Sequence, residues 1–309
     1  MAVKGGEYAT EIPQPGSWRE FMKWRRDHKK LIKLHQARGE KFPAVGSDPE
    51  GLLRSDKDSL TWAGHASTIL RVGGHTILSD PVWSNRVGVI IKRLTPPSPA
   101  WHEVPPPDLI TISHNHYDHL DSSTIRRVKK ETRVAVPKGV GAWFRKRRFR
   151  NVEEFDWWQT KEYDGLSVTF VPSRHFSGRT LWDRNKSLFG GWILEANGRR
   201  TYHSGDTGYF AGFREIGQRF PGIDIACLPI GAYLPRWIMQ EIHTDPDEAG
   251  RAFRDLGAKR MLPIHWGTFR LSDEAMDAPP ETLRAHFEKE KIDLGRLLLP
   301  DLGSPIHLV

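Results

Sequence analysis

The chain has 309 residues, of which 38% are hydrophobic and 10% aromatic, and this suits a globular protein with one large α/β domain or two small ones. The formal net charge of +8 and the pI of about 9.6 favour anionic partners such as nucleic acid, anionic lipid or a phosphorylated substrate, without choosing among them. The single cysteine, Cys227, excludes an intrachain disulfide and lies in an apolar run typical of a core residue.

Targeting signals are not evident in the sequence. No uncharged apolar run approaches the ~18 residues of a membrane span, and the first residues lack the apolar core of a secretory signal. We therefore expect a cytoplasmic protein whose membrane contact, where it has any, is peripheral on the inner face.

The N-terminal 55 residues are predicted to be an arm with a helix and a linker, ahead of a main domain over residues 56–309. The helix is predicted over residues 17–38, where eight basic side chains stand against Glu20 and Asp27. A basic helix with aromatic residues suits the surface of an anionic membrane. The alternative is a helix that packs its apolar side on the main domain and leaves its charges in solvent.

An antiparallel start to a sheet is predicted next. Two strands surround a Gly64-His65 corner, and a turn at Gly73-Gly74 leads into a third strand that ends at Asp80. His65 either contacts a functional site or is a structural corner residue. Asp80 is a candidate for the carboxylate that a metal-bound histidine needs on its other ring nitrogen, the alternative being an Asp-Pro turn.

The stretch His114-x-His116-x-Asp118-His119 follows an apolar run and places four metal-capable side chains within six residues. If strand geometry persists, His114 and His116 point the same way, and Asp118 and His119 in the turn that follows face a second position. This exceeds what one tetrahedral zinc needs from one segment, so the motif predicts a site for two metals. A polar loop that happens to hold three histidines is the alternative.

Three further metal-capable residues follow apolar runs later in the chain. A Pro-rich surface excursion over 84–108, a helix over 121–130, a strand over 133–137 and a basic aromatic stretch over 143–150 are predicted around the motif. Strands over 167–172 and 201–206 and an apolar run over 261–264 then end near His175, Asp206 and His265. Because α/β folds place chemistry at strand ends, we expect these three residues to join the motif.

Several segments together resemble the N-acylphosphatidylethanolamine-hydrolysing phospholipase D family, which has the metallo-β-lactamase fold. The resemblance spans about two thirds of the chain and implies an αββα sandwich of two mixed sheets flanked by helices, with residues 56–309 as the catalytic domain. The segments that carry it are Trp62-x-Gly64-His65-Ala66, residues 114–121, residues 179–188, Gly190-Gly191-Trp192, residues 205–209, residues 228–233, Pro235-Arg236-Trp237 and residues 264–269.

The resemblance also implies a ligand set. His114, His116 and His175 would hold one zinc, Asp118, His119 and His265 the other, and Asp206 would bridge both. Iron or manganese would suit the same ligands. His243 falls where the family has a histidine suspected of acting on substrate, although Ile242 stands where a glutamine precedes that histidine in the family. Asp118, Asp206 and His243 are thus the catalytic candidates.

The implied activity is hydrolysis of N-acylphosphatidylethanolamine or a related phospholipid to N-acylethanolamine and phosphatidic acid. A hydroxide held between two metals would attack the phosphorus. Alternatives are a lactonase, an enzyme of soluble phosphodiesters, a nuclease, or a non-catalytic basic binder. We expect no nucleic-acid partner, and the sequence does not predict the oligomeric state. Further candidates for supporting the metals or contacting substrate are His65, Asp80, Arg174, Arg179, Trp182, Lys186, Tyr233 and Arg236.

Overall fold

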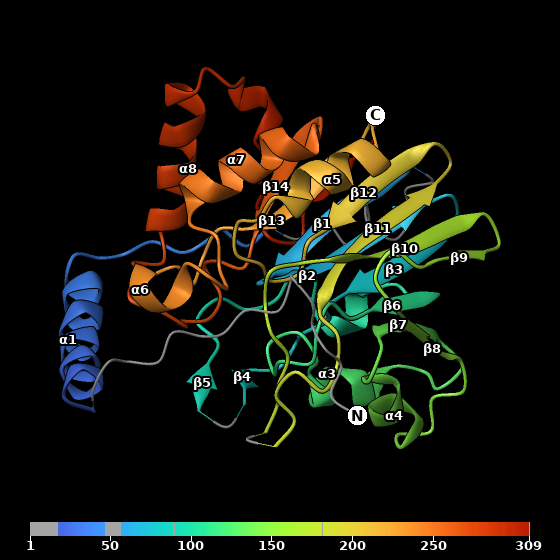
Figure 1. Cartoon of the computed structure of the whole chain (residues 1–309), viewed down its shortest axis with the longest axis horizontal. Helices are drawn as coiled ribbons and strands as arrows, with labels where there is room; N and C mark the ends of the chain where they lie inside the picture. Colours follow the sequence, from blue (N-terminus) through green and yellow to red (C-terminus); the bar gives the residue numbers. More distant parts are fainter. Residues whose placement is uncertain (1–17, 47–56, 89, 181, 309) are drawn as a thin grey trace.

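The computed structural model describes residues 18–46, 57–88, 90–180 and 182–308, apart from the side chains of residues 18–22 and 25. Two β-sheets lie face to face, with helices on both outer sides (Figure 1). The predicted αββα sandwich of two mixed sheets is therefore confirmed. Among the described helices, none is long and apolar enough to cross a membrane.

The first sheet has seven strands in the order β15-β1-β2-β3-β6-β7-β8. Its first half is antiparallel and its second half, from β3 to β8, is parallel. The predicted turn between β2 and β3 is present, with both Gly73 and Gly74 at positive φ. The strands are β1 (Ser59–Gly64), β2 (Ser67–Val72), β3 (His75–Ser79), β6 (Leu109–Thr111), β7 (Arg133–Pro137), β8 (Val152–Phe155) and β15 (Pro305–His307).

The second sheet has six strands in the order β14-β13-β12-β11-β10-β9. Strands β9 to β12 pair antiparallel, whereas β12, β13 and β14 pair parallel. The predicted strand over 201–206 ends earlier, at His203, so Asp206 lies in the loop that follows. The strands are β9 (Thr160–Tyr163), β10 (Leu166–Pro172), β11 (Gly190–Ala196), β12 (Arg199–His203), β13 (Ile225–Pro229) and β14 (Arg260–Ile264).

Helices cover the two outer faces. In Figure 1, α3 and α4 lie below the first sheet, and α5, α7 and α8 lie above the second. Asp121 caps α3, and an Asp245–Glu248 capping box starts α7, because their carboxylates accept bonds from backbone N–H groups that have no partner in the first turn. The helices are α1 (Trp18–Ala37), α3 (Ser122–Arg127), α4 (Gly141–Arg145), α5 (Gly212–Arg219), α6 (Arg236–Met239), α7 (Pro246–Leu256) and α8 (Ala278–Lys289).

The Pro-rich excursion over 84–108 is more ordered than a plain loop. It contains a short hairpin of β4 (Arg86–Val87) and β5 (Ile91–Lys92) and a 3-10 turn, η2 (Trp101–Glu103), while a second 3-10 turn, η3 (Leu294–Arg296), follows α8. The buried side chain of Arg93 donates hydrogen bonds to the carbonyls of Ser84 and Val82 and so ties the hairpin to the end of the preceding segment.

Three apolar layers hold the sandwich together. The central layer joins the facing sides of the two sheets and includes Cys227, which is buried as predicted. One outer layer joins the first sheet to α3 and α4, and the other joins the second sheet to α5, α7 and α8. Burial of this much apolar surface fixes both sheets, so the loops at their edges are presented on a rigid frame.

Strand direction brings the predicted site residues to one edge. In the first sheet β1, β3 and β6 run the same way, so the residues that follow them emerge together. In the second sheet β10, β12 and β14 likewise share one direction. These six strands therefore deliver their loops to the metal edge, the name used below for the edge at which they end.

Helix α1 contacts the segment that follows β14. The indole of Trp24 donates to Asp273 at 2.8 Å, His28 pairs with the same carboxylate, and His35 contacts the carbonyl of Asp273 at 3.0 Å. The predicted helix is thus present over Trp18–Ala37. Ser17 and the arm boundary at residue 55 lie outside the described residues, and the division into an arm and a domain stays a prediction.

Candidate metal centre

The first sheet contributes one contiguous loop to the centre. Strand β6 ends at Thr111, so His114 and His116 lie in the loop and not in an extended strand. The expected strand alternation is therefore not what aligns them. A turn does so instead, in which the N–H groups of His119 and Leu120 both donate to the carbonyl of His116. This turn folds the motif back on itself and points its side chains into one space.

The second sheet contributes single residues from separate loops. His175 follows β10, Asp206 follows β12 and His265 follows β14. All three are buried, at 1–3% exposure. His265 has a φ of 62°, a strained value for a residue with a side chain, and its N–H is held by the carbonyl of His65. This cross-sheet hydrogen bond ties the two contributions together.

One ligand group forms around the first two histidines of the motif. Nε2 of His114 and Nδ1 of His116 are 2.8 Å apart, and the latter is 3.3 Å from Nε2 of His175. Nε2 of His114 and Nε2 of His175 each lie 3.8 Å from Oδ2 of Asp206. Donor atoms around a tetrahedral zinc lie about 3.3 Å apart, so these four residues match that spacing.

The second group forms around Asp118. Its Oδ2 is 3.1 Å from Nε2 of His65, 3.6 Å from that of His265 and 3.9 Å from that of His119. Asp206 lies beside this group as well, with Oδ2 3.1 Å from Nε2 of His119 and Oδ1 3.2 Å from Nε2 of His265. Its carboxylate therefore faces both groups, which is the arrangement that a bridging ligand requires.

His65 belongs to the second group. Its ring is buried at 1% exposure and lies 4.1 Å from that of His265, centroid to centroid. The sequence left open whether His65 contacts the site or only shapes a corner. The structure shows that it does both, because its backbone takes the left-handed conformation at a φ of 53° while its side chain meets Asp118.

The carboxylate of Asp80 contacts the outer ring nitrogen of His119. Its Oδ2 lies 2.7 Å from Nδ1 of His119 and accepts a hydrogen bond from the hydroxyl of Ser113 at 2.6 Å. Its Oδ1 accepts from the N–H of Ser113 at 2.7 Å. A carboxylate on the outer ring nitrogen fixes the orientation of the imidazole and directs Nε2 toward the centre. Sequence reasoning missed Ser113, although its place directly before His114 was a usable signal.

The electrostatics divide the histidines into two kinds. Burial lowers the pKa of His65 to about 3 and that of His116 to about 4, and it moves the pKa values of His114 and His175 well below normal. Burial acts on His119 and His265 in the same sense, but nearby carboxylates, Asp206 first, outweigh it and raise the pKa of His265 to about 9 and that of His119 well above normal.

The donor set fits bound cations. His119 Nε2, His265 Nε2 and Asp206 Oδ1 are buried and make no hydrogen bond of good geometry with the described residues, although the Asp206 carboxylate lies 3.1–3.2 Å from both imidazole nitrogens. Neutral imidazole nitrogens that face one another repel through their lone pairs, and a cation between them turns the repulsion into ligation. The four-residue groups His65, Asp118, His119, His265 and His114, His116, His175, Asp206 each bring their donor atoms within 4.8 Å of one another.

His243 adjoins the centre on the side of the second sheet. It is 8% exposed, its ring centroid lies 5.2 Å from that of His265, and its Nδ1 has no hydrogen-bond partner among the described residues. Burial lowers its pKa to about 4, so the imidazole is neutral near pH 7. With Asp206 and His265 it forms a third group of converging donor atoms.

The candidate arginines have protein partners. Arg179 donates to the carbonyls of Asn115 at 2.9 Å and Leu120 at 2.7 Å, and its guanidinium lies 4.1 Å from the ring centroid of Tyr117. In this structure Arg179 therefore holds the histidine loop, which is a role that the sequence interpretation did not assign to it.

Arg236 and Arg174 are engaged in the same way. Arg236 donates to Glu248 at 2.7 Å and to the carbonyl of His243 at 3.1 Å. Arg174 pairs with Glu241 and donates to the carbonyl of Tyr209. Both side chains stabilise the loops beside the centre, so contact with a substrate would require these bonds to be exchanged.

The other candidates for substrate contact lie at the surface. Trp182 is 82% exposed, and Lys186 is exposed on the same loop. Tyr233 is half-buried in a hollow of about 340 Å³ between α1 and the segment that follows β13. Burial and the neighbouring Glu274 raise the pKa of Tyr233 to about 12. Contact of these three residues with substrate stays a prediction.

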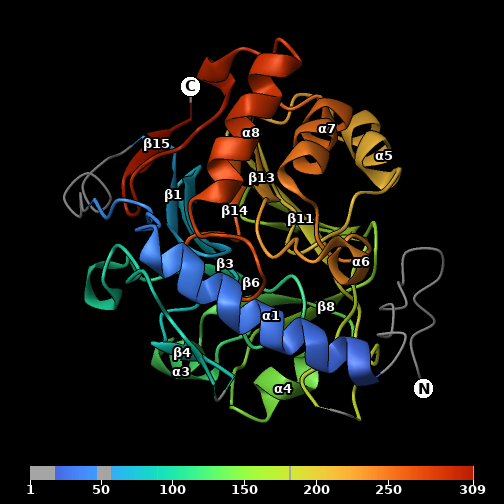
Figure 2. The same cartoon turned by 90° about the vertical axis from the view of Figure 1, so that its left-hand side faces the viewer.

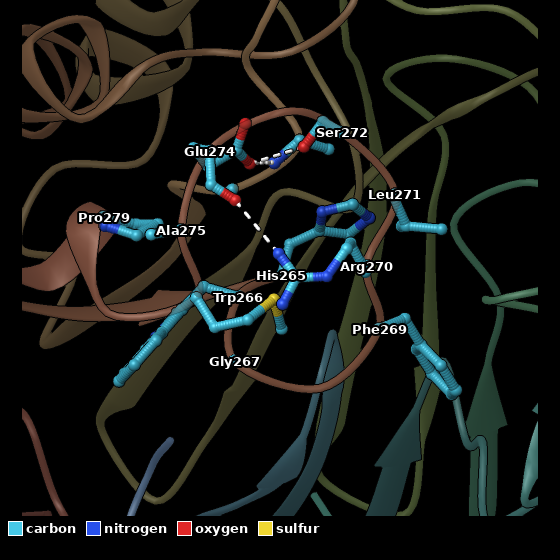
Figure 3. Close-up of a pocket in the computed structure, with 13 residues that line it drawn as sticks. His265, Trp266, Gly267, Phe269, Arg270, Leu271, Ser272, Glu274, Ala275 and Pro279 are labelled. Atoms are coloured by element: carbon cyan, nitrogen blue, oxygen red, sulfur yellow. Dashed lines mark hydrogen bonds between the residues drawn. The ribbon is translucent and has the colours of Figure 1, made fainter. Parts of the chain in front are cut away.

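A buried carboxylate beside His265 was also missed. Figure 3 shows Glu274 next to Ser272 on the loop that carries His265. Its Oε1 accepts from the N–H of Ala232 at 2.6 Å and its Oε2 from the N–H of Leu234 at 3.1 Å. Glu274 thus joins the loops after β13 and β14, and no local sequence pattern marks it.

Comparison with known proteins identifies the class. Residues 75–266 match the family model described as a β-lactamase superfamily domain. The chain belongs to the metallo-β-lactamase superfamily and is a metal-dependent hydrolase of that fold. A metallo hydrolase from the archaeon Ignicoccus hospitalis has the same fold, with a TM-score of 0.63 at 23% identity over 81% of this chain and 97% of that one.

Relatives with higher sequence identity include one uncharacterised protein and two proteins named as phospholipases D. An uncharacterised protein of Mycobacterium tuberculosis is 38% identical over 86% of this chain and 74% of its own length. N-acyl-phosphatidylethanolamine-hydrolysing phospholipases D of Saccharomyces cerevisiae and Caenorhabditis elegans are 37% and 34% identical, over 79% and 68% of this chain. This chain spans 54% of the yeast enzyme and 64% of the nematode enzyme.

Proposed function

We propose that this chain is a zinc-dependent phosphodiesterase of the phospholipase D type, which hydrolyses N-acylphosphatidylethanolamine or a related phospholipid to an N-acylethanolamine and phosphatidic acid. The observation that carries the proposal is the pair of ligand groups that share Asp206. The two relatives named as phospholipases D direct the choice of substrate.

The residues would divide the work between them. His114, His116 and His175 would hold one ion, Asp118, His119 and His265 the other, with Asp206 between them and His65 beside Asp118. Two zinc ions supply a hydroxide at neutral pH and stabilise negative charge on a phosphoryl group. The buried imidazoles with depressed pKa values are already neutral, which is the form that binds a metal.

His243 would serve the substrate and not the metal. Its Nδ1 is buried and has no partner among the described residues, and the bond from Arg236 to its carbonyl fixes the backbone that carries it. A neutral imidazole in this position can hold a hydrogen bond to an oxygen of the substrate through one of its ring nitrogens. Ile242 supplies no side-chain amide beside His243, whereas its backbone carbonyl lies 2.9 Å from Nδ1 of His175.

The test combines metal analysis with a lipid assay. We expect two zinc ions per chain and release of N-acylethanolamine from N-acylphosphatidylethanolamine in detergent micelles, abolished by a chelator and restored by zinc. His75→Asn should leave metal content and release unchanged, since His75 lies on β3 outside the ligand groups and, within the described residues, its ring contacts the carbonyl of Asp164. Two metals without release of product would refute the lipid substrate and would indicate a soluble phosphodiester or a lactone instead.

A further inference from the structure

Helix α1 has two faces with different surroundings. At about 100° per residue, Trp24, His28, Leu31 and His35 fall within an arc of about 60°. Three of these four side chains contact Asp273, and Leu31 and His35 line the hollow beside Tyr233. This arc is therefore the docked face of the helix, and it fixes the rotation of α1 about its own axis.

The opposite face is cationic. By the same geometry, five basic side chains span an arc of about 120° whose centre lies opposite the docked face. They are Lys23, Arg26, Lys29, Lys30 and Lys33, and all five are exposed. Among the side chains that the structure describes, one of these five forms an ion pair. Nε of Arg26 lies 3.6 Å from Oδ1 of Asp27, and both side chains are well exposed. Within the described part of the chain, Asp27 is thus the one acidic side chain that pairs with this face, which otherwise presents its charge to solvent.

One apolar side chain borders the cationic face. Leu34 lies about 20° beyond its edge and is 63% exposed, whereas Leu31, at 37% exposure, belongs to the docked face. Exposed aromatic residues also occur elsewhere on the surface, with Trp182 in the segment between β10 and β11 at 82% exposure and Trp237 in α6 at 42%. Cations with aliphatic and indole side chains favour the interface of a bilayer over the phosphates of a nucleic acid, since a bilayer also accepts the apolar groups.

The position of α1 relates this face to the site. Asp273, which anchors the helix, lies in the segment that follows His265 and β14, and Figure 2 shows α1 crossing the face of the molecule turned toward the viewer. A surface that binds the cationic face would therefore lie beside the metal edge. That is where a phospholipid in a bilayer must present its headgroup.

We propose that the cationic face of α1 docks the protein on an anionic phospholipid surface. Each basic side chain near such a surface strengthens binding roughly fivefold. The choice of a lipid surface rests on the proposed function, whereas the cationic face does not. Docking in this orientation leaves the anchor at Asp273 intact, so the helix joins the bilayer to the loop that carries His265.

The experiment measures binding of the whole chain to vesicles by co-sedimentation. Wild type is expected to bind phosphatidylcholine vesicles that contain phosphatidylglycerol, to bind phosphatidylcholine alone weakly, and to release as salt rises from about 0.1 M to about 1 M. Lys29→Glu with Lys33→Glu should weaken binding roughly thirtyfold, the equivalent of two basic contacts. Zinc content and the thermal midpoint report that the variant is folded.

Arg284→Glu with Lys289→Glu is the matched control, because both side chains are exposed on α8 and the change in charge is the same. This variant should bind within about threefold of wild type, since charges far from the docked bilayer are screened. Equal binding of the α1 variant and wild type, or equal binding of wild type to neutral vesicles, would overturn the proposal. So would tighter binding to single-stranded RNA that the α1 variant loses.

The outcomes also separate this proposal from the proposed function. Binding to anionic vesicles without hydrolysis of N-acylphosphatidylethanolamine would keep the docking surface and refute the substrate. Hydrolysis in micelles without binding to vesicles would keep the substrate and refute the surface.

Discussion

The two sheets supply the candidate centre in different ways. The first sheet provides one loop in which four ligand residues lie within six positions, together with His65 and Asp80 at the ends of β1 and β3. The second sheet provides His175, Asp206 and His265, which are separated by 31 and then 59 positions. The ligands from the first sheet are close in sequence, and their loop is held by the turn at His116 and by the guanidinium of Arg179. The ligands from the second sheet come together only when β10, β12 and β14 are in register.

This difference predicts where each half is vulnerable. A contiguous loop can lose its shape through one broken support, because its ligands share a backbone. The separate residues of the second sheet are each fixed by a buried strand, so a change beside one of them leaves the others in place. Asp206 is the exception, since its carboxylate faces both groups.

Asp206→Asn should have the largest effect. An amide supplies one oxygen and no charge where the carboxylate faces both groups, so we expect metal content to fall below two per chain and turnover to fall more than about 100-fold. Loss of an outer partner alone costs about 10–100-fold, and this residue is closer. Elemental analysis and single-turnover assays measure both effects. Retention of two metals with full activity would remove the bridging role.

Asp80→Asn should follow. The amide keeps an acceptor for the N–H of Ser113 but places an N–H group where Nδ1 of His119 now meets an oxygen. We expect metal affinity to fall about 10–100-fold. Competition with a chromogenic chelator gives the affinity. Asp108→Asn is the control, because Asp108 accepts from the N–H of Thr76 at the far end of β3. Equal loss in both variants would point to a general effect on the sheet.

The sequence predicted the ligand residues of the site more completely than the side chains that hold their loops in place. The motif and the strand ends are local patterns, so the sequence alone was enough to name His114, Asp206 and His265 as metal-capable residues. Apolar runs were enough to predict individual strands, whereas the sandwich of two mixed sheets came from the family resemblance. The expectation that alternation along a strand orients His114 and His116 was wrong. The turn at residues 116–119, and not an extended strand, aligns the loop.

The supports could not be predicted because they join distant positions. Arg179 holds carbonyls about 60 positions away, and Glu274 holds N–H groups about 40 positions away. Nothing in the sequence distinguishes a cation that binds backbone carbonyls from one that binds phosphate, since both uses need only an available N–H donor. The anchor of α1 on Asp273 is hidden for the same reason.

Arg179→Gln should loosen the local half without removing a ligand. Two short hydrogen bonds from a guanidinium to loop carbonyls would be lost, which lowers the free energy of unfolding by about 2–3 kcal/mol. We expect faster amide exchange in residues 114–120 and a metal affinity about tenfold weaker. Arg184→Gln is the control, an exposed guanidinium 5.5 Å from the ring of Phe176. Unchanged exchange in the loop would show that Arg179 acts on the substrate instead.

Arg236→Gln should have the smallest effect and should spare the metals. Its guanidinium joins Glu248 to the carbonyl of His243, and the loss of these partly exposed contacts costs about 1 kcal/mol. We expect two metals to remain while turnover falls about threefold to tenfold, because the backbone that carries His243 is less well fixed. Arg251→Gln removes a weaker pair with the same Glu248, at 3.6 Å, from an exposed position. A fall in metal content specific to Arg236→Gln would mean that this loop supports the ligand groups themselves, and would join His243 to the metal-binding half of the second sheet.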